Sequence, residues 1–121
     1  MSDDISQISR VVQDYFDGLH YADTGKLARI FDDHAWLSSP GIRRTKQQWL
    51  ELVASRPVPA SVGYPYEYKL LSIELYAEQA MVKLSCPLLG QHYIDFLGLL
   101  KEQQQWKIVS KMYAVAPTVP A

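Results

Sequence analysis

The sequence predicts an α+β domain in which a strongly curved antiparallel sheet wraps around three N-terminal helices to enclose a pocket. Two observations predict this class. Apolar residues recur with helical spacing in the first half of the chain, and after Pro65 they alternate with the period of two that is typical of strands. Because 121 residues is near the usual size of one domain, we expect residues 1–121 to form a single domain.

Two helices are predicted at the start of the chain. The first runs from about Ile5 to Leu19, where apolar residues form one face and Gln, Arg and Asp form the other. Asp3 or Asp4 is placed to cap it. A second, shorter helix is predicted to begin at residue 23 or 24 and to bury the apolar residues that follow.

A capping box predicts the start of a third helix. Thr45 and Gln48 have the spacing at which the Thr hydroxyl and the Gln amide each satisfy an unpaired backbone N–H. We therefore expect a helix from about Lys46 to Ser55. Pro57 forces the preceding residue away from helical angles, so the chain from there to residue 65 is predicted to be a loop.

The second half of the chain predicts long antiparallel strands. The alternation slips by one residue between Leu70 and Leu71, which indicates a β-bulge that bends the sheet. Other strands are predicted at residues 80–86, 91–101 and 106–113, with a short one at 35–38 between the second and third helices. Because the strand at 91–101 is apolar on both faces and no helix is left to cover the outer one, we expect a homodimer that packs through this face.

Composition argues against several partners. The net charge of −1 provides no field to attract nucleic acid or an anionic membrane, and we interpret the Arg43-Arg44 doublet as a solvated turn. Cys86 is the only cysteine, and the polar N-terminus and lack of a long apolar run are unlike a targeted or membrane-spanning chain, which favours the cytoplasm. The three histidines lack metal-ligand spacing and no phosphate-binding loop occurs, so no metal or cofactor is expected.

Two segments resemble a known superfamily. Residues 11–37, VVQDYFDGLHYADTGKLARIFDDHAWL, are similar to the opening of nuclear-transport-factor-2-like proteins, and residues 93–113, YIDFLGLLKEQQQWKIVSKMY, resemble the closing hairpin of the lumazine-binding or polyketide-cyclase-like branch. Together they cover about half of the chain. The resemblance implies the cone-like, curved sheet of this superfamily, which is also called cystatin-like.

Within this superfamily the sequence is also similar to ketosteroid isomerase, where a Tyr and a protonated Asp form an oxyanion hole. The VVQDY and YIDF motifs place Tyr15 and Asp95 at those two positions. The general base of that enzyme is an Asp before a Pro at the end of the first strand, where this chain has Ser39 before Pro40. The resemblance therefore implies two groups that can bind a carbonyl oxygen, without the base that would move a proton.

Each polar candidate also has a purely structural interpretation. Tyr15 can be a core tyrosine, and Asp95 can form an ion pair with Lys111 on the neighbouring strand, which would keep the carboxyl ionised. His34 precedes the first strand, where it is either a base at the pocket mouth or a surface histidine. These alternatives remain open at the level of sequence.

The aromatic residues favour a flat or ring-shaped ligand. With Tyr15, Asp95 and Lys111, the predicted ligand-binding residues are Trp36, Trp49, Tyr93 and Tyr113. We therefore predict a domain that binds a small apolar or ring-shaped molecule. Two alternatives remain: a cofactor-independent lyase, isomerase or cyclase that acts next to a carbonyl with Tyr15, Asp95 and His34, and a dimeric protein-interaction module.

Overall fold

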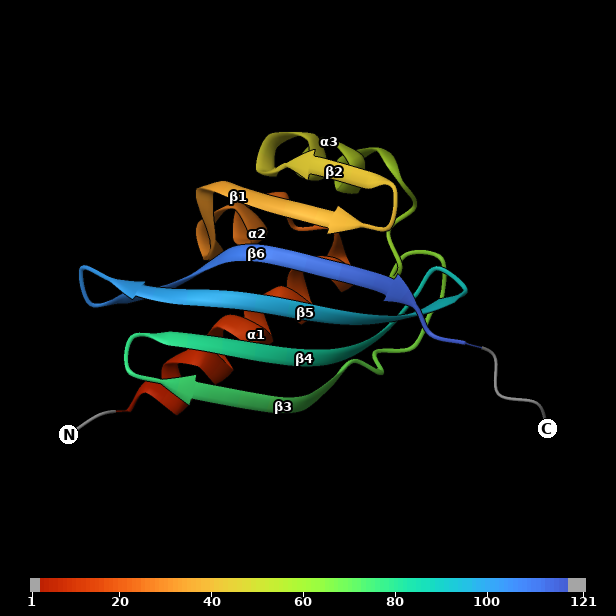
Figure 1. The fold of residues 1–121 in the computed structure, drawn as a ribbon. Helices are drawn as coiled ribbons and strands as arrows, with labels where there is room; N and C mark the ends of the chain where they lie inside the picture. Colours follow the sequence, from red (N-terminus) through yellow and green to blue (C-terminus); the bar gives the residue numbers. More distant parts are fainter. Residues whose placement is uncertain (1–2, 118–121) are drawn as a thin grey trace.

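In the computed structural model, which describes residues 3–117, helices lie behind one face of a curved six-stranded sheet (Figure 1). The helices are α1 (Asp4–Tyr21), α2 (Thr24–Ile30) and α3 (Lys46–Ser55). The strands are β1 (Phe31–Ser39), β2 (Ile42–Thr45), β3 (Lys69–Tyr76), β4 (Gln79–Leu88), β5 (Gln91–Glu102) and β6 (Gln105–Val115). This is the α+β class that the sequence predicted.

The strand order is β2-β1-β6-β5-β4-β3, and the sheet does not close on itself. All neighbouring strands are antiparallel except β1 and β6, which pair in parallel. The sheet is therefore mixed, where the sequence predicted it to be antiparallel. Residue alternation reveals which face a side chain occupies, but it carries no information about which distant strand lies alongside or in which direction.

Side-chain caps form at two of the three helix starts, and the one at α3 was predicted from the sequence. The Asp23 carboxylate accepts a hydrogen bond of 3.0 Å from the backbone N–H of Lys26 at the start of α2. At α3, Thr45 and Gln48 form both hydrogen bonds of the predicted capping box. Asp3 is the N-cap residue of α1 but makes no such bond to the backbone.

The region between α2 and α3 differs most from the prediction. β1 begins at Phe31 and not at residue 35, and a second strand, β2, includes the Arg43-Arg44 doublet that was predicted to be a solvated turn. The turn lies just before it, where Gly41 has a φ of 78° that favours glycine. In β2 the two arginine side chains alternate, so Arg43 is exposed whereas Arg44 is half-buried.

The predicted slip in β3 is confirmed, because the β3–β4 register shifts between Leu70 and Ser72. β3 begins at Lys69, later than the alternation indicated. β4 continues through Pro87 to Leu88, where the sequence predicted that the proline would end it. β3 has no residue opposite Pro87, so the proline occupies an edge position, at which a missing N–H is tolerated.

One end of the sheet is closed against α1. Lys101 Nζ and Trp106 Nε1 each donate a hydrogen bond of 3.0 Å to Asp4 Oδ1, which ties the β5–β6 hairpin to the first turn of the helix. Core residues from α1 and from all the long strands pack between these layers. The other end, where β1, β4 and β6 finish and β5 begins, is the end at which a hollow remains.

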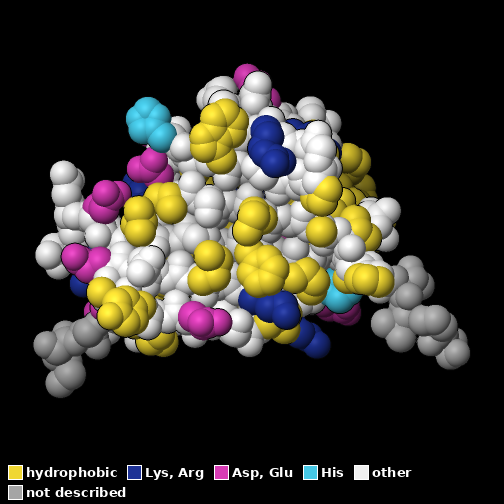
Figure 2. Space-filling model, viewed as in Figure 1, with side chains coloured by type: hydrophobic (Ala, Val, Ile, Leu, Met, Phe, Trp, Pro, Cys, Tyr) yellow, Lys and Arg dark blue, Asp and Glu magenta, His cyan; other side chains and the backbone are white. Residues whose placement is uncertain are grey.

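The outer face of the sheet carries exposed apolar side chains. Figure 2 shows hydrophobic residues spread over this face, which no helix covers. They include Phe96 and Met112, which lie opposite one another on β5 and β6, and Trp36 on β1. Among residues 3–117, no helix is both long and apolar enough to cross a membrane.

Candidate ligand cavity

A cavity of about 420 Å³ lies between the inner face of the sheet and the helices. This volume is within the range of sites that hold small molecules. Its walls come from α1, the end of β1, β2, α3, β4, the turn after it, β5 and β6. Most of the lining surface is apolar, and the residues with polar groups in it are Ser39, Arg44, Arg56, Cys86, Tyr93, Asp95, Lys111 and Tyr113.

The two polar groups singled out by sequence meet in this region. The Tyr15 hydroxyl of α1 donates a hydrogen bond of 2.6 Å to Asp95 Oδ2 of β5. Both side chains are buried, with exposed fractions of 0% and 3%. Burial and the negative charge of Asp95 raise the pKa of the Tyr15 phenol well above its ordinary value, so the phenol stays protonated and remains a donor.

This arrangement differs from two donors converging on a ligand oxygen. The hydroxyl hydrogen of Tyr15 is directed to Asp95, and Asp95 lines the cavity whereas Tyr15 lies behind it. Tyr15 therefore positions the carboxylate, and Asp95 is the member of the pair that can contact a ligand. A charge-assisted bond of this kind stabilises a buried carboxylate by roughly 1.5–3 kcal/mol.

Lys111 occupies a cage of aromatic rings. Its Nζ lies 4.2 Å from the centroid of the Trp49 ring, 5.0 Å from that of Tyr113 and 5.3 Å from that of Tyr15. Such cation–π contacts partly replace the water that a buried ammonium loses. Within residues 3–117, no ion pair shorter than 4.0 Å includes Lys111, so the direct Asp95–Lys111 pair considered from sequence is not formed.

The register of the sheet sets the relative position of the two groups. Lys111 is opposite Leu97, and Asp95 is opposite Tyr113, so the lysine and the carboxylate are diagonal neighbours on the inner face. The charge of Asp95 still raises the pKa of Lys111, but burial lowers it more strongly. The result is a pKa of about 8 for Lys111, well below the ordinary value of 10.5.

Two arginines that were not predicted as site residues also face the cavity. Arg44 of β2 donates a hydrogen bond of 2.9 Å from Nη1 to the Tyr113 hydroxyl. Arg56 follows α3 in an extended conformation, and its Nη2 is buried without a hydrogen-bond partner. Burial lowers the pKa of Arg56 as well. Buried donors are nearly always satisfied, so an unpaired guanidinium nitrogen in a cavity wall is an informative exception.

Cys86 adds a neutral group to the same wall. Burial, followed by the charge of Asp95, raises the pKa of its thiol far above the ordinary value. The thiol therefore remains protonated, and it lacks the low pKa that characterises a nucleophilic cysteine. Among residues 3–117 there is also no group of three or more His, Cys, Asp or Glu residues that could hold a metal ion.

The structure separates the predicted ligand-binding residues into two sets. Trp49, Tyr93, Asp95, Lys111 and Tyr113 line the cavity, and Tyr15 supports it from behind.

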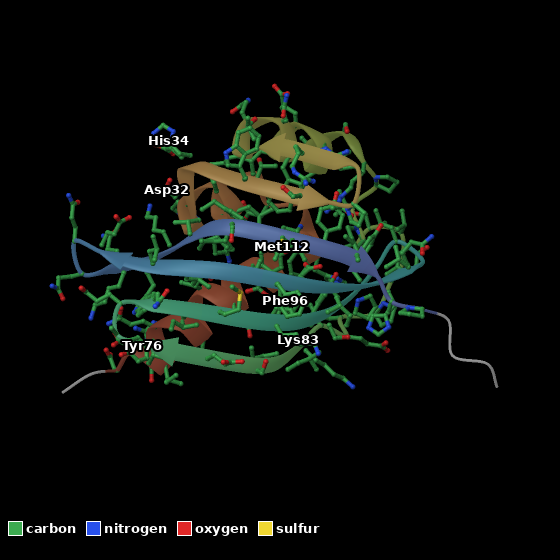
Figure 3. The ribbon with its side chains drawn as sticks, in the orientation of Figure 1. Asp32, His34, Tyr76, Lys83, Phe96 and Met112 are labelled. Atoms are coloured by element: carbon green, nitrogen blue, oxygen red, sulfur yellow. The ribbon has the colours of Figure 1, made fainter. Side chains whose placement is uncertain are left out.

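Trp36 and His34 do not line the cavity. Trp36 is 55% exposed and lines a groove on the outer face, because strand alternation turns it away from its neighbour in sequence, the buried Leu37. His34 is exposed near the start of β1, at the opposite end of the sheet from the cavity (Figure 3). The geometry therefore gives no support to His34 as a base for cavity chemistry.

Some of the cavity-lining residues that were not predicted had a recognisable signal in the sequence. Ile42 and Arg44 share a face across one intervening residue, which is the alternation of a strand, but the adjacent arginines obscured it. Arg56 was assigned only to the helix end before Pro57. Nothing local indicates that its side chain turns inward, because that depends on where α3 docks on the sheet.

Solved structures define the class of fold. A protein from Silicibacter pomeroyi that is described as NTF-2 like and of unknown function aligns with a TM-score of 0.80 and 21% identity, covering 96% of this chain and 100% of that one. A ketosteroid isomerase-like protein from Erwinia carotovora atroseptica aligns with a TM-score of 0.76 and 15% identity, covering 98% and 100%. At these identities the likeness shows a nuclear-transport-factor-2-like fold.

The family of the protein is shown by a match of its sequence to a family model. A family model described as "Putative lumazine-binding" matches residues 3–114, which is most of the chain, and the protein therefore belongs to this family. A further similar structure, an NTF2-like protein of unknown function from Shewanella baltica, has a TM-score of 0.77 and 22% identity and covers 94% of both chains. No curated protein matches the chain.

Proposed function

We propose that this protein binds a small molecule with a flat or ring-shaped apolar body in the cavity between its sheet and its helices. The observation that carries the proposal is a hollow of about 420 Å³ that remains inside an otherwise packed core and that is walled by Trp49, Tyr93 and Tyr113. Protein interiors are normally filled to the density of organic crystals, so an apolar hollow with a few polar groups is a feature of ligand sites.

Geometry supports the aromatic character of the ligand. The rings of Tyr93 and Tyr113 meet edge to face with centroids 5.9 Å apart, and both line the cavity. Rigid rings of this kind offer large contact areas at little cost in side-chain entropy. Asp95, held by Tyr15, supplies a fixed hydrogen-bond acceptor, which orients a ligand that has a donor group.

The test is to block the cavity without disturbing the core. Val115 lines the cavity at the end of β6 and is 52% exposed, so Val115→Trp should obstruct the hollow while the protein still folds. We expect flat ring compounds found by ligand-detected NMR on the unmodified protein to lose binding to this variant. Leu71→Trp is the control, because Leu71 is also exposed but belongs to β3 and does not line the cavity. Equal binding to both variants, or no binding ring compound at all, would contradict the proposal.

We further propose that residues 1–121 act as one domain that dimerises through the outer sheet face in the cytoplasm. Exposed apolar residues on β5 and β6, Phe96 and Met112 among them, support the interface because monomeric proteins seldom leave such a patch open. A two-fold arrangement would cover the same patch on both copies. Sedimentation of the purified protein should therefore give twice the mass of the chain.

A further inference from the structure

The charge on the cavity wall is unbalanced. Its charged groups are three cations, Arg44, Arg56 and Lys111, and one carboxylate, Asp95. The whole chain, in contrast, carries a net charge of −1. The cavity wall therefore has an excess of positive charge that the chain as a whole does not have.

Protein groups do not neutralise these cations. Within residues 3–117, the ion pairs shorter than 4.0 Å join other residues: Lys26 with Asp17, Lys46 with Asp33, and Lys101 with Asp4. Arg44 bonds to the neutral hydroxyl of Tyr113, and Lys111 lies against aromatic rings. Nη2 of Arg56 is buried and has no partner. Lys111 is buried, Arg44 and Arg56 are half-buried, and Asp95 is the one carboxylate in the wall, so positive charge is in excess and an occupant of opposite charge would offset its cost.

The cations also oppose one another electrostatically. The charges of Arg56 and Arg44 both lower the pKa of Lys111, in addition to the effect of burial. An anion bound among them would reverse this influence. Binding would then increase the protonation of Lys111 in the range where the free protein has begun to lose that proton.

We propose that the ligand is a carboxylic acid, bound as the carboxylate by Arg56 and Arg44 with its ring against the aromatic wall. This inference rests on the function proposed above and specifies the class of ligand. A guanidinium presents its N–H groups in a fork that matches the two oxygens of a carboxylate. Asp95 repels the acid group of the ligand and so directs it toward the arginines.

A carboxylate fits the site better than a phosphate. Phosphate sites commonly use backbone N–H groups at a helix N-terminus or in a glycine-rich loop. The helix end nearest to Arg56 is instead the C-terminus of α3, where the helix dipole is negative and disfavours a dianion. The rest of the wall consists largely of apolar side chains, which suit a ring that carries one acid group.

The deciding experiment compares ligands that differ only in charge. We would measure the binding of 2-naphthoate, 2-naphthamide and 2-naphthyl phosphate by calorimetry at neutral pH and low salt. We expect naphthoate to bind at least about tenfold more tightly than the amide, as for hydrogen bonds to charged partners. Equal binding of acid and amide overturns this inference but leaves the proposed function intact. Tighter binding of the phosphate overturns the choice of carboxylate, and no binding of any probe overturns both proposals.

Variants identify the side chains that bind the carboxylate of naphthoate. Arg56→Gln and Arg44→Gln should each weaken naphthoate binding about tenfold and weaken naphthamide binding much less, and naphthamide binding also reports on correct folding. Arg43→Gln is the matched control, because Arg43 is the neighbour of Arg44 on β2 but is exposed and does not line the cavity. An equal loss of naphthoate binding in the control would show a general field effect and would overturn the assignment.

The melting temperature of Arg56→Gln without ligand distinguishes an arginine that binds the ligand from one that supports the fold. An arginine that supports the fold lowers the melting temperature when it is replaced. Because Nη2 of Arg56 is buried without a hydrogen-bond partner, Arg56→Gln should instead leave the melting temperature of the ligand-free protein unchanged or raise it. A clear fall in the melting temperature of Arg56→Gln, with naphthoate binding unaffected, would identify a structural arginine and overturn the proposal.

Discussion

The inner and outer faces of the sheet depart from the usual distribution of side chains in opposite ways. On the inner face, Asp95 and Lys111 are buried at 3% and 6% exposure, where apolar side chains are the rule. On the outer face, Phe96 and Met112 are exposed, where polar side chains are the rule. Buried charges and exposed apolar patches are the departures that carry information. These departures are the basis of the ligand site proposed for the inner face and of the dimer interface proposed for the outer face.

The largest expected difference between the faces concerns their two tryptophans. Trp49 is 1% exposed and supports Lys111, so Trp49→Ala should lower the free energy of unfolding by about 3–5 kcal/mol. Trp36→Ala, on the outer face, should cost less than about 1 kcal/mol. Urea denaturation of both variants at one protein concentration provides the comparison. Similar losses would mean that the outer face is as tightly packed as the inner one.

A pH titration tests the buried charge on the inner face. Because the pKa of Lys111 is about 8 in the folded protein and 10.5 ordinarily, the unfolded chain binds more protons between these values. Stability should therefore rise with pH from about 8 toward 10.5, by at most about 3 kcal/mol. Above pH 9 the raised pKa of Cys86, and above pH 10 those of Tyr15 and Tyr68, act in the opposite direction, because the thiol and phenols of the unfolded chain then ionise first. Urea unfolding at several pH values should show the rise in the unmodified protein and not in Lys111→Met.

The hydrogen bond between α1 and the inner face should have an intermediate effect. Tyr15→Phe leaves Asp95 Oδ2 without its donor, which we expect to lower the free energy of unfolding by roughly 1.5–3 kcal/mol. Tyr21→Phe is the matched control on the same helix, because Tyr21 is 58% exposed and should tolerate the change. If the two variants unfold at the same urea concentration, the bond contributes nothing measurable.

The smallest expected effect concerns the outer face. Phe96→Glu would place a charge in the centre of the proposed dimer interface and should weaken association by about tenfold or more, which is about 1.4 kcal/mol. Tyr76→Glu is the control, because Tyr76 lies at a far corner of the same face (Figure 3). Analytical ultracentrifugation over a concentration series measures both. A dimer that is unaffected by Phe96→Glu would place the interface elsewhere.

Sequence reasoning succeeded where the signal is local. The capping box at Thr45 and the slip after Leu70 depend on neighbouring residues, and the structure contains both. The prediction that Tyr15 and Asp95 lie close together came from the resemblance to a known family. Sequence spacing could not provide it, because 80 positions separate the two residues. Their role toward a ligand stays a proposal.

The remaining features depend on how elements pack and could not be predicted in this way. The parallel pairing of β1 with β6 decides which side chains lie beside β6, and the aromatic cage around Lys111 includes Trp49 from the distant helix α3. The docking of α3 directs Arg56 inward. Trp36 shows that the presence of an aromatic residue in the sequence does not predict that it lines the pocket, because its side chain can lie on the other face of the strand.

The position of the two arginines relative to α3 has a consequence for how such cavities diversify. Arg44 stands just before the capping residue Thr45, and Arg56 comes directly after Ser55, so one ten-residue helix joins them. Its length of about 15 Å spaces the two attachment points along a single stiff rod. Exchange of residues 44–56 alone would therefore replace both arginines of the wall and retain Asp95 and Lys111 on β5 and β6, so that ligand preference can evolve by substitution of one short segment.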